Sequence, residues 1–344
     1  SVMLTSHPAL KAAQARWEAM RARVQQARAW PDARVGLDVE RSRTTQFTSF
    51  TDNEWMAAQE LPLSGKNLQR ARASTAEAAA AFGDVRRREL DLVARARTAY
   101  WRYANASVRL ELNQRNEQLS RDVVDISRSK YQVGTRQLSD VLTAEFELAR
   151  SLEARLDIER DLTEAQSELN TLMNRAPHED LPPPARPVFK PLVVPPLRDP
   201  SAAHGEPPDQ FLFDWPVFHH QMQSGALRHR PELLRAGQLI EAAQARYTLA
   251  RREWIPDPEL RVEARQFNGA AKGISEYDTG LFIRVPWLNR AKYKAAIEEA
   301  KKNLEAARHE LAALEIETQG MVRNQSRRVE IFQKHYEFVR DNLV

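Results

Sequence analysis

Residues 230–256 read RPELLRAGQLIEAAQARYTLARREWIP, and residues 7–31 read HPALKAAQARWEAMRARVQQARAWP. Each stretch has a proline near its start, a helix-forming middle, and a tryptophan close to a proline at its end. The similarity continues at an offset of about 224 residues, because the segment LPLSGK at Leu61–Lys66 parallels VPWLNR at Val285–Arg290. An alignment this long indicates that the chain contains an internal duplication.

Each repeat contains two short segments typical of β-strands after its first helix. Apolar and charged or small residues alternate over 34–40 and again over 259–263, which is the period of a half-buried strand. Each repeat therefore has the order helix, strand, strand, long helix. We predict strands at about 33–41, 54–62, 258–267 and 277–286, joined by polar loops at 42–53 and 268–276.

The helices that follow the strands are long. The first is predicted at about 67–131, which at 1.5 Å per residue is roughly 95–100 Å. A second is predicted at 140–173 and a third from 291 onward. Apolar residues of the first helix recur in the steps of seven, four and three that are typical of coiled coils. They form two series, Val85, Leu92, Ala96, Ala99, Tyr103, Ala106 and Leu110, and then Leu112, Leu119, Val123 and Ile126.

A tight turn with the sequence VGTRQLSD at 133–140 separates the first two long helices. Gly134 suits the left-handed position that follows a helix C-terminus. Ser139 or Asp140 suits the N-cap of the next helix. We therefore predict a helical hairpin with an exposed tip at about 132–140.

Prolines divide the chain into three regions. Residues 176–215 contain many prolines, which forbid a continuous helix and favour an extended linker. The first structural repeat is therefore assigned to 1–175 and the second to 216–344.

Composition excludes several classes of function. Charged residues make up 28% of the chain, but their signs are mixed and the net charge is only +4, which does not favour nucleic-acid binding. The chain has no cysteine, so it has neither disulfides nor thiolate metal ligands. It has no Gly-rich phosphate loop, nucleophile elbow or HExxH motif. We therefore predict no enzymatic activity and no cofactor.

With these features the chain resembles the outer membrane efflux protein family, the TolC-like channels, and especially its CzcC-like and CusC-like branch. The duplicated helix–strand–strand–helix unit is the first point of resemblance. The others are ELPLSGKN at 60–67, close to the family's Pro-Leu-x-Gly-Lys, YQVGTRQLSDVLTA at 131–144, and RPEL at 230–233. The segment at 131–144 is similar to the family's tip sequence Tyr-x-x-Gly-x-x-Ser-x-x-Asp-x-Leu-x-Ala, with Gln137 in place of the serine.

The resemblance implies a mainly α fold with a small β part that assembles as a homotrimer. Three protomers would each give four strands to one 12-stranded outer-membrane β-barrel, continued by a periplasmic coiled-coil barrel of helices. It implies a passive export channel in a tripartite efflux or type I secretion system. The partners would be outer-membrane lipid, a periplasmic adaptor and an inner-membrane pump that delivers the substrate. The alternative is a non-transporting periplasmic coiled-coil scaffold or adaptor protein.

The family also has a tip turn and a returning helix in the second repeat. This sequence ends at Val344, inside the long helix. We expect the second repeat to be truncated before its tip.

The hairpin tip is the first candidate site. The resemblance implies that it docks the adaptor through Val133, Gly134, Thr135, Leu138 and Ser139. The apolar pair Val133 and Leu138 at an exposed turn favours docking. The alternative is a connecting turn with no partner.

Two other groups of residues are weighed as sites. Asp122 and Asp125 precede the tip and are candidates for a lumen-facing gate; the alternative is an exposed helix face that also carries Arg121 and Arg128. His219 and His220, with His204 and His229 nearby, suggest a metal site. Adjacent histidines point to different sides of a helix and no carboxylate completes a ligand set, so we predict no metal.

Overall fold

The computed structural model describes residues 4–5, 7–42, 50–185, 215–266, 274 and 276–343. Most of these residues are helical, and the rest include one small sheet, which confirms the predicted mainly α fold. The chain forms two compact units. We call Gln14–Asp84 with Asp214–Phe332 the sheet unit, and Ser1–Ala13, Val85–Phe213 and Gln333–Val344 the hairpin unit. Most of the predicted linker, 186–214, lies outside the described residues.

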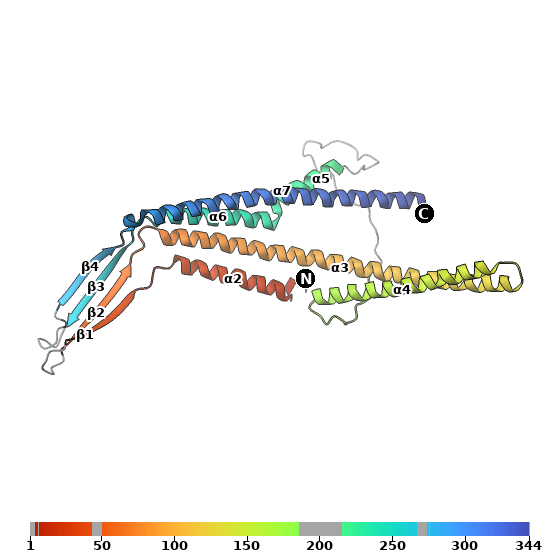
Figure 1. Cartoon of the computed structure of the whole chain (residues 1–344), viewed down its shortest axis with the longest axis horizontal. Coiled ribbons are helices and arrows are strands. Elements are labelled where there is room, and N and C mark those ends of the chain that lie inside the picture. Colours follow the sequence, from red (N-terminus) through yellow and green to blue (C-terminus); the bar gives the residue numbers. More distant parts are fainter. Residues whose placement is uncertain are drawn as a thin grey trace, which may run out of the picture. The chain divides into compact units, whose positions relative to one another are not determined.

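The sheet contains four antiparallel strands in the order β1-β2-β3-β4 (Figure 1). They are β1 (Arg34–Ser42), β2 (Phe50–Glu60), β3 (Pro258–Gln266) and β4 (Glu276–Ile283). The first hairpin belongs to one repeat and the second hairpin to the other, so the central pairing of β2 with β3 joins the repeats. Leu37 lies opposite Trp55, and Trp55 lies opposite Ala264. β1 and β4 are left as the two edges of the sheet.

Four helices adjoin the same end of the sheet (Figure 1). They are α2 (Pro8–Arg28), α3 (Lys66–Gln132), α6 (Pro231–Arg252) and α7 (Arg290–Leu343), and the short helix α5 (Trp215–His229) precedes α6. The bounds of α3 lie within one residue of the prediction. The order α2-β1-β2-α3 is repeated as α6-β3-β4-α7.

Small residues bring α3 and α6 together inside the sheet unit. Ala73, Ala76 and Ala80 of α3 and Ala242 and Ala245 of α6 are buried. The two helices are antiparallel, since Glu77 pairs with Arg246 and, a turn or two further along α3, Asp84 pairs with Arg235 at 3.0 Å. A Cβ atom on Gly83 would lie 3.1 Å from Cβ of Arg235. Glycine therefore permits the close approach of α6 at this point.

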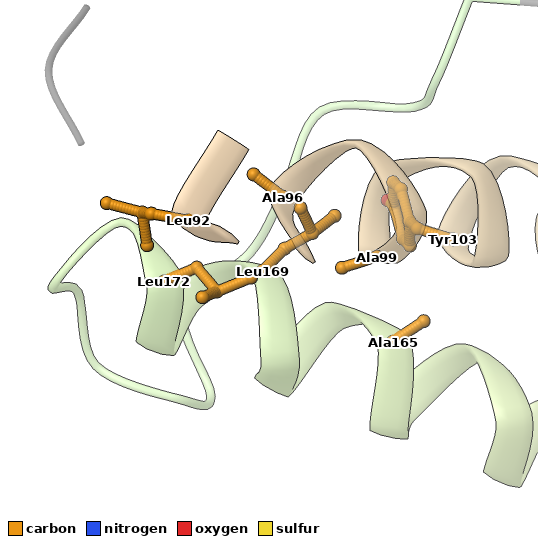
Figure 2. Close-up of a cluster of buried hydrophobic side chains, with 7 residues drawn as sticks. All are labelled: Leu92, Ala96, Ala99, Tyr103, Ala165, Leu169 and Leu172. Carbon is orange, nitrogen blue, oxygen red and sulfur yellow. The ribbon is translucent and has the colours of Figure 1, made fainter. Parts of the chain in front are cut away.

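The hairpin unit is built on α3 and α4 (Leu138–Leu172), which pack through leucine and alanine (Figure 2). This core consists of residues from one face of each helix: Leu92, Ala96, Ala99, Tyr103, Ala165, Leu169 and Leu172. On α3 these positions are separated by steps of four and three, which is coiled-coil spacing. Four residues of the first predicted apolar series, Leu92, Ala96, Ala99 and Tyr103, are therefore confirmed as a packed seam.

The second predicted series lies elsewhere. Toward the tip, the buried seam of α3 continues at Glu117, Val124 and Ser127. Leu119, Val123 and Ile126 are instead 63%, 52% and 54% exposed. The second series does not continue this seam, because the steps of four and three from Tyr103 lead to Glu117, Val124 and Ser127 instead. The apolar stripe formed by Leu112, Leu119, Val123 and Ile126 thus has no cover within the described part of the chain.

Ion pairs hold the register of the hairpin. Arg102 pairs with Glu168 at 3.3 Å, and two turns further along α3 Arg109 pairs with Asp161 at 3.1 Å. The buried carboxylate of Glu117 binds Arg155 of α4 at 3.2 Å and also Arg121 of its own helix. A charge with two cationic partners tolerates burial between helices far better than an unpaired one.

After α4 the chain turns back along the hairpin and is fastened by Asn170. This side chain is fully buried, and its Nδ2 donates to the carbonyl oxygens of Pro177 at 3.2 Å and Glu179 at 2.6 Å. The hydroxyl of Tyr103 donates to the carbonyl oxygen of Leu181 at 3.4 Å. These bonds satisfy backbone groups that have no strand or helix partner.

Candidate functional site

The sheet has one apolar face. Alternate residues of each strand point to the same side, and the strand register brings those of all four strands together. Val35 is 83% exposed and Leu281 is 67% exposed, so this face is uncovered in the single chain. Its side chains include Val35, Leu37, Val39, Trp55, Ala57, Leu260, Val262, Ala264, Tyr277, Thr279, Leu281 and Ile283. An exposed apolar surface of this kind marks contact with a membrane or a partner.

The opposite face is charged, and on β2 and β3 its side chains are less exposed than those of the apolar face. Arg265 lies between Glu54 at 3.3 Å and Glu263 at 3.7 Å. Arg261 bridges Glu259 and Glu263 at 3.4 and 3.6 Å, and its guanidinium lies 4.2 Å from the ring centre of Phe282. Glu259 and Glu263 are only partly exposed. The charged face is therefore a network of alternating charges rather than a surface of one sign.

A buried ion pair joins the two repeats where the strands meet the helices. Nζ of Lys66 lies 3.0 Å from Oδ2 of Asp257 and donates to the carbonyl oxygen of Ile255 at 2.7 Å. Asp257 also accepts hydrogen bonds at 2.8 Å from the backbone N–H and the hydroxyl of Ser64. Burial raises the pKa of Asp257, but the bonds from Ser64 and Lys66 outweigh it and hold the pKa below its usual value. We call this set of contacts the junction.

Gly65 lets the chain make the junction. Its φ is +70°, a left-handed conformation that glycine adopts without strain. A Cβ atom there would lie 2.5 Å from Nη1 of Arg252. That guanidinium donates to the carbonyl oxygens of Ser64 at 3.4 Å and Gly65 at 3.2 Å. The LPLSGK segment that carried the family resemblance is thus a binding site for Asp257 and Arg252 of the other repeat.

The hairpin tip has the geometry of a Schellman turn. Gly134 has φ +73°, its N–H donates to the carbonyl oxygen of Tyr131, and the N–H of Thr135 donates to that of Lys130, each at 2.9 Å. The predicted left-handed glycine is therefore confirmed. The predicted N-cap is wrong, because α4 begins at Leu138 and its N-cap is Gln137, which makes no side-chain cap. Ser139 and Asp140 consequently lie inside the first turn.

The five predicted tip residues lie together at the end of the hairpin. Val133 is 72% and Leu138 is 51% exposed, and Gly134, Thr135 and Ser139 are exposed as well. A Cβ atom on Gly134 would meet nothing within 4 Å. Next to the tip, an open groove of about 430 Å³ runs between α3 and α4 and includes Leu119 and Val123 of the apolar stripe. The docking role of these residues stays a prediction.

Asp122 and Asp125 are both exposed on α3, one turn apart. The neighbouring arginines form ion pairs with other carboxylates: Arg121 pairs with Glu117, and Arg128 pairs with Glu145 at 2.6 Å. Within the described residues, neither Asp122 nor Asp125 has a side-chain ion pair. The side chains of these two aspartates are therefore available to whatever lies in front of this helix face.

His219 of α5 fastens that helix to α7. One ring nitrogen lies 2.8 Å from the hydroxyl of Ser326, and the other lies 3.2 Å from Oε2 of Glu330. The described residues contain no group of three or more His, Cys, Asp or Glu side chains arranged to hold a metal ion. His204 lies outside the described residues.

Sequence comparison adds to this geometry. A model of the family described as outer membrane efflux protein matches residues 1–175 and 223–344. The chain belongs to the outer membrane efflux protein family. The family consists of channel proteins of the outer membrane rather than enzymes, so the chain is an outer-membrane efflux protein that extends into the periplasm of a Gram-negative bacterium. No curated protein matches the sequence.

Solved structures of similar proteins share the fold of this efflux protein. The outer-membrane channel OprN is 20% identical, with a TM-score of 0.79 over 98% of this chain and 75% of its own. CusC is 15% identical, with a TM-score of 0.77 over 99% of this chain and 76% of its own. The CmeC outer membrane channel of Campylobacter jejuni is 15% identical, with a TM-score of 0.76 over 99% of this chain and 71% of its own.

Among the described helices of the efflux protein, none combines the length and the apolar composition that crossing a lipid bilayer requires.

Proposed function

We propose that the chain is one protomer of a homotrimeric channel that passively conducts substrates across the outer membrane. Three copies of the sheet would close a 12-stranded β-barrel, and the helices would continue it into the periplasm. The observation that carries the proposal is the division of the sheet into an exposed apolar face and an opposite face of paired charges. The apolar face contacts lipid, and the charged face lines the pore.

The dimensions and edges of the sheet support this arrangement. The four strands have 9, 11, 9 and 8 residues, and a tilted strand that spans a bilayer needs about 9–11. Two polar residues of the apolar face, Gln59 and Gln266, lie at strand ends, where headgroups and water are close. Free strand edges are not tolerated in lipid. β1 and β4 therefore need neighbours from other copies.

The exposed stripe of α3 supports assembly of the helical part. Leu112, Leu119, Val123 and Ile126 recur in coiled-coil steps, but each side chain is more than half exposed. A second helix packed on this stripe would bury it as a coiled-coil seam. We assign that helix to a neighbouring copy, so that trimerisation covers the stripe.

For transport, the channel would receive its substrate from an inner-membrane pump through a periplasmic adaptor that docks at the hairpin tip. Val133 and Leu138 are apolar contacts, and Gly134, Thr135 and Ser139 leave room for close approach of a partner. Asp122 and Asp125 would face the lumen near this entrance. Replacing Leu138 with Asp should abolish export while leaving the trimer folded. Glu153→Lys, on an exposed position of α4 away from the tip, should leave export unchanged; export by Leu138→Asp at the normal rate would overturn docking at the tip.

The orientation of the sheet can be tested with single cysteines, because the natural chain has none. Val262→Cys and Glu263→Cys are adjacent in β3 but point to opposite faces. In proteoliposomes, a membrane-impermeant thiol reagent should label the cysteine at 263 through the pore and leave the cysteine at 262 unlabelled. Equal labelling at both positions would contradict a lipid-facing apolar side.

A further inference from the structure

The two charged residues of the junction have counterparts at the matching positions of the other repeat, and these counterparts do not pair with each other. Asp257 follows Pro256, and at the matching place in the first repeat Asp32 follows Pro31. Lys66 is the first residue of α3, and Arg290 is the first residue of α7. Lys66 and Asp257 are buried, whereas Asp32 and Arg290 are exposed. Neither of the latter makes a side-chain ion pair with the described part of the chain.

The same repetition predicts how the edge strands pair. In the chain, β2 and β3 are antiparallel, with Ala57 opposite Val262 and Gln59 opposite Leu260. The hairpins β1–β2 and β3–β4 share the same internal register once aligned as repeats. Transferring the β2–β3 pairing to β4 of one copy and β1 of the next sets Leu281 opposite Leu37 and Ile283 opposite Val35. All four side chains belong to the apolar face, which this pairing extends without a break.

We infer that copies of this chain join head to tail through a second junction, in which Arg290 of one copy binds Asp32 of the next. β4 of the first copy then lies antiparallel to β1 of the second, with Leu281 opposite Leu37. This inference rests on the trimeric channel proposed above and specifies its subunit contact. A heterologous contact of this kind generates a closed ring when the rotation between copies closes.

Sequence differences between the two junctions fit this assignment. Ser64, which gives Asp257 two hydrogen bonds, is matched by Leu288, which has no hydroxyl. Lys66, a point charge, is matched by Arg290. A guanidinium binds a carboxylate through two parallel N–H groups. The second N–H group of the Arg290 guanidinium can therefore take the place of the hydroxyl donor that Leu288 lacks.

Paired cysteines test the register. In Leu37→Cys/Leu281→Cys the two positions lie on opposite edges of their own sheet and out of register, so that they are more than about 14 Å apart at the usual strand spacing. A disulfide between them within one chain is therefore excluded. Mild oxidation should convert the detergent-purified trimer into covalently linked trimers on denaturing, non-reducing gels. The matched control Asp38→Cys/Leu281→Cys directs the thiols to opposite faces and should remain monomeric on the gel. Linkage of the control instead would mean a register shifted by one residue and would overturn the inference.

A charge exchange tests the second junction itself. Asp32→Arg and Arg290→Asp should each lower the fraction of trimer in detergent, because each sets two like charges against each other. The double variant restores the pair at every subunit contact and should recover the trimer. Additive loss in the double variant would contradict the pairing of these residues.

Different results would overturn the trimeric channel and the second junction. A wild-type protein that is monomeric in detergent and in membranes would overturn the trimeric channel, and the inference with it. A stable, conducting wild-type trimer without linkage between positions 37 and 281, and without rescue by the charge exchange, would overturn the inference alone.

Discussion

Nζ of Lys66 lies 3.0 Å from Oδ2 of Asp257, so the first residue of one repeat's long helix is held by the residue that precedes the first strand of the other repeat. Both side chains are buried at the end of the sheet. Together with the pairing of β2 and β3, this contact makes one structural unit out of two repeats that are far apart in sequence. The stability of the sheet unit should therefore depend on the junction.

Gly65→Ala should destabilise the sheet unit by about 2 kcal/mol. The left-handed conformation costs an L residue about 1–2 kcal/mol, and the new Cβ displaces the guanidinium of Arg252 from two carbonyl oxygens. Urea unfolding in detergent, followed by circular dichroism, measures the effect. Gly237→Ala is the matched control, because Gly237 is helical and its Cβ would meet nothing. That variant should be as stable as the wild type or more so; equal stability of both variants would contradict this account of Gly65.

Asp257 should make the stability of the sheet unit sensitive to acid. Its pKa in the folded protein lies below the ordinary value of 3.8, so its stabilising contribution is complete above about pH 4 and is lost as pH falls through the lowered pKa. Asp257→Asn retains the size of the side chain but cannot ionise. The variant should be less stable than the wild type at neutral pH, and the difference should shrink at about pH 3. A difference that stays constant with pH would show that the charge of Asp257 is not what stabilises the junction.

Asn170→Ala should loosen the segment that follows α4. The substitution removes the side-chain donor of the Pro177 carbonyl oxygen and one of the two side-chain donors of the Glu179 carbonyl oxygen, which also accepts from Gln166 at 3.0 Å. Each hydrogen bond lost costs about 0.5–1.5 kcal/mol. Limited proteolysis should then cut within 174–182 faster than in the wild type. Asn174→Ala, at the left-handed residue that ends the helix, strains the turn but keeps the Asn170 bonds. It should therefore be cut more slowly than Asn170→Ala.

Asp122 and Asp125 should set the ion preference of the channel. If these exposed carboxylates face the lumen, the double variant Asp122→Asn/Asp125→Asn should lower the preference for cations over anions. Reversal potentials across a salt gradient measure this preference. Glu111→Gln, at a carboxylate that already pairs with Arg115, is the control and should change it little. An unchanged reversal potential in the double variant would assign Asp122 and Asp125 to an outer face of the helices.

The sequence was sufficient to predict the elements because each carried a local signal. Period-two alternation located β1 and β3, and Gly134 located the end of α3. The sequence did not reveal against which other element each one packs. The sequence LPLSGK indicated a strand-to-helix turn, but only the folded chain shows that Asp257 and Arg252 bind there, since both come from the other repeat. Similarly, steps of four and three permit two faces of α3 to act as a seam near the tip, and the position of α4 decides between them.

Single-channel conductance in a planar lipid bilayer shows whether the trimer is a conducting channel. Trimer purified in detergent is added to one side at low concentration, and current is recorded under a fixed voltage. We expect discrete, uniform current steps, which should become rarer with the Asp32→Arg variant because it forms less trimer. Folded wild-type trimer that inserts into the bilayer but produces no steps would contradict a conducting channel.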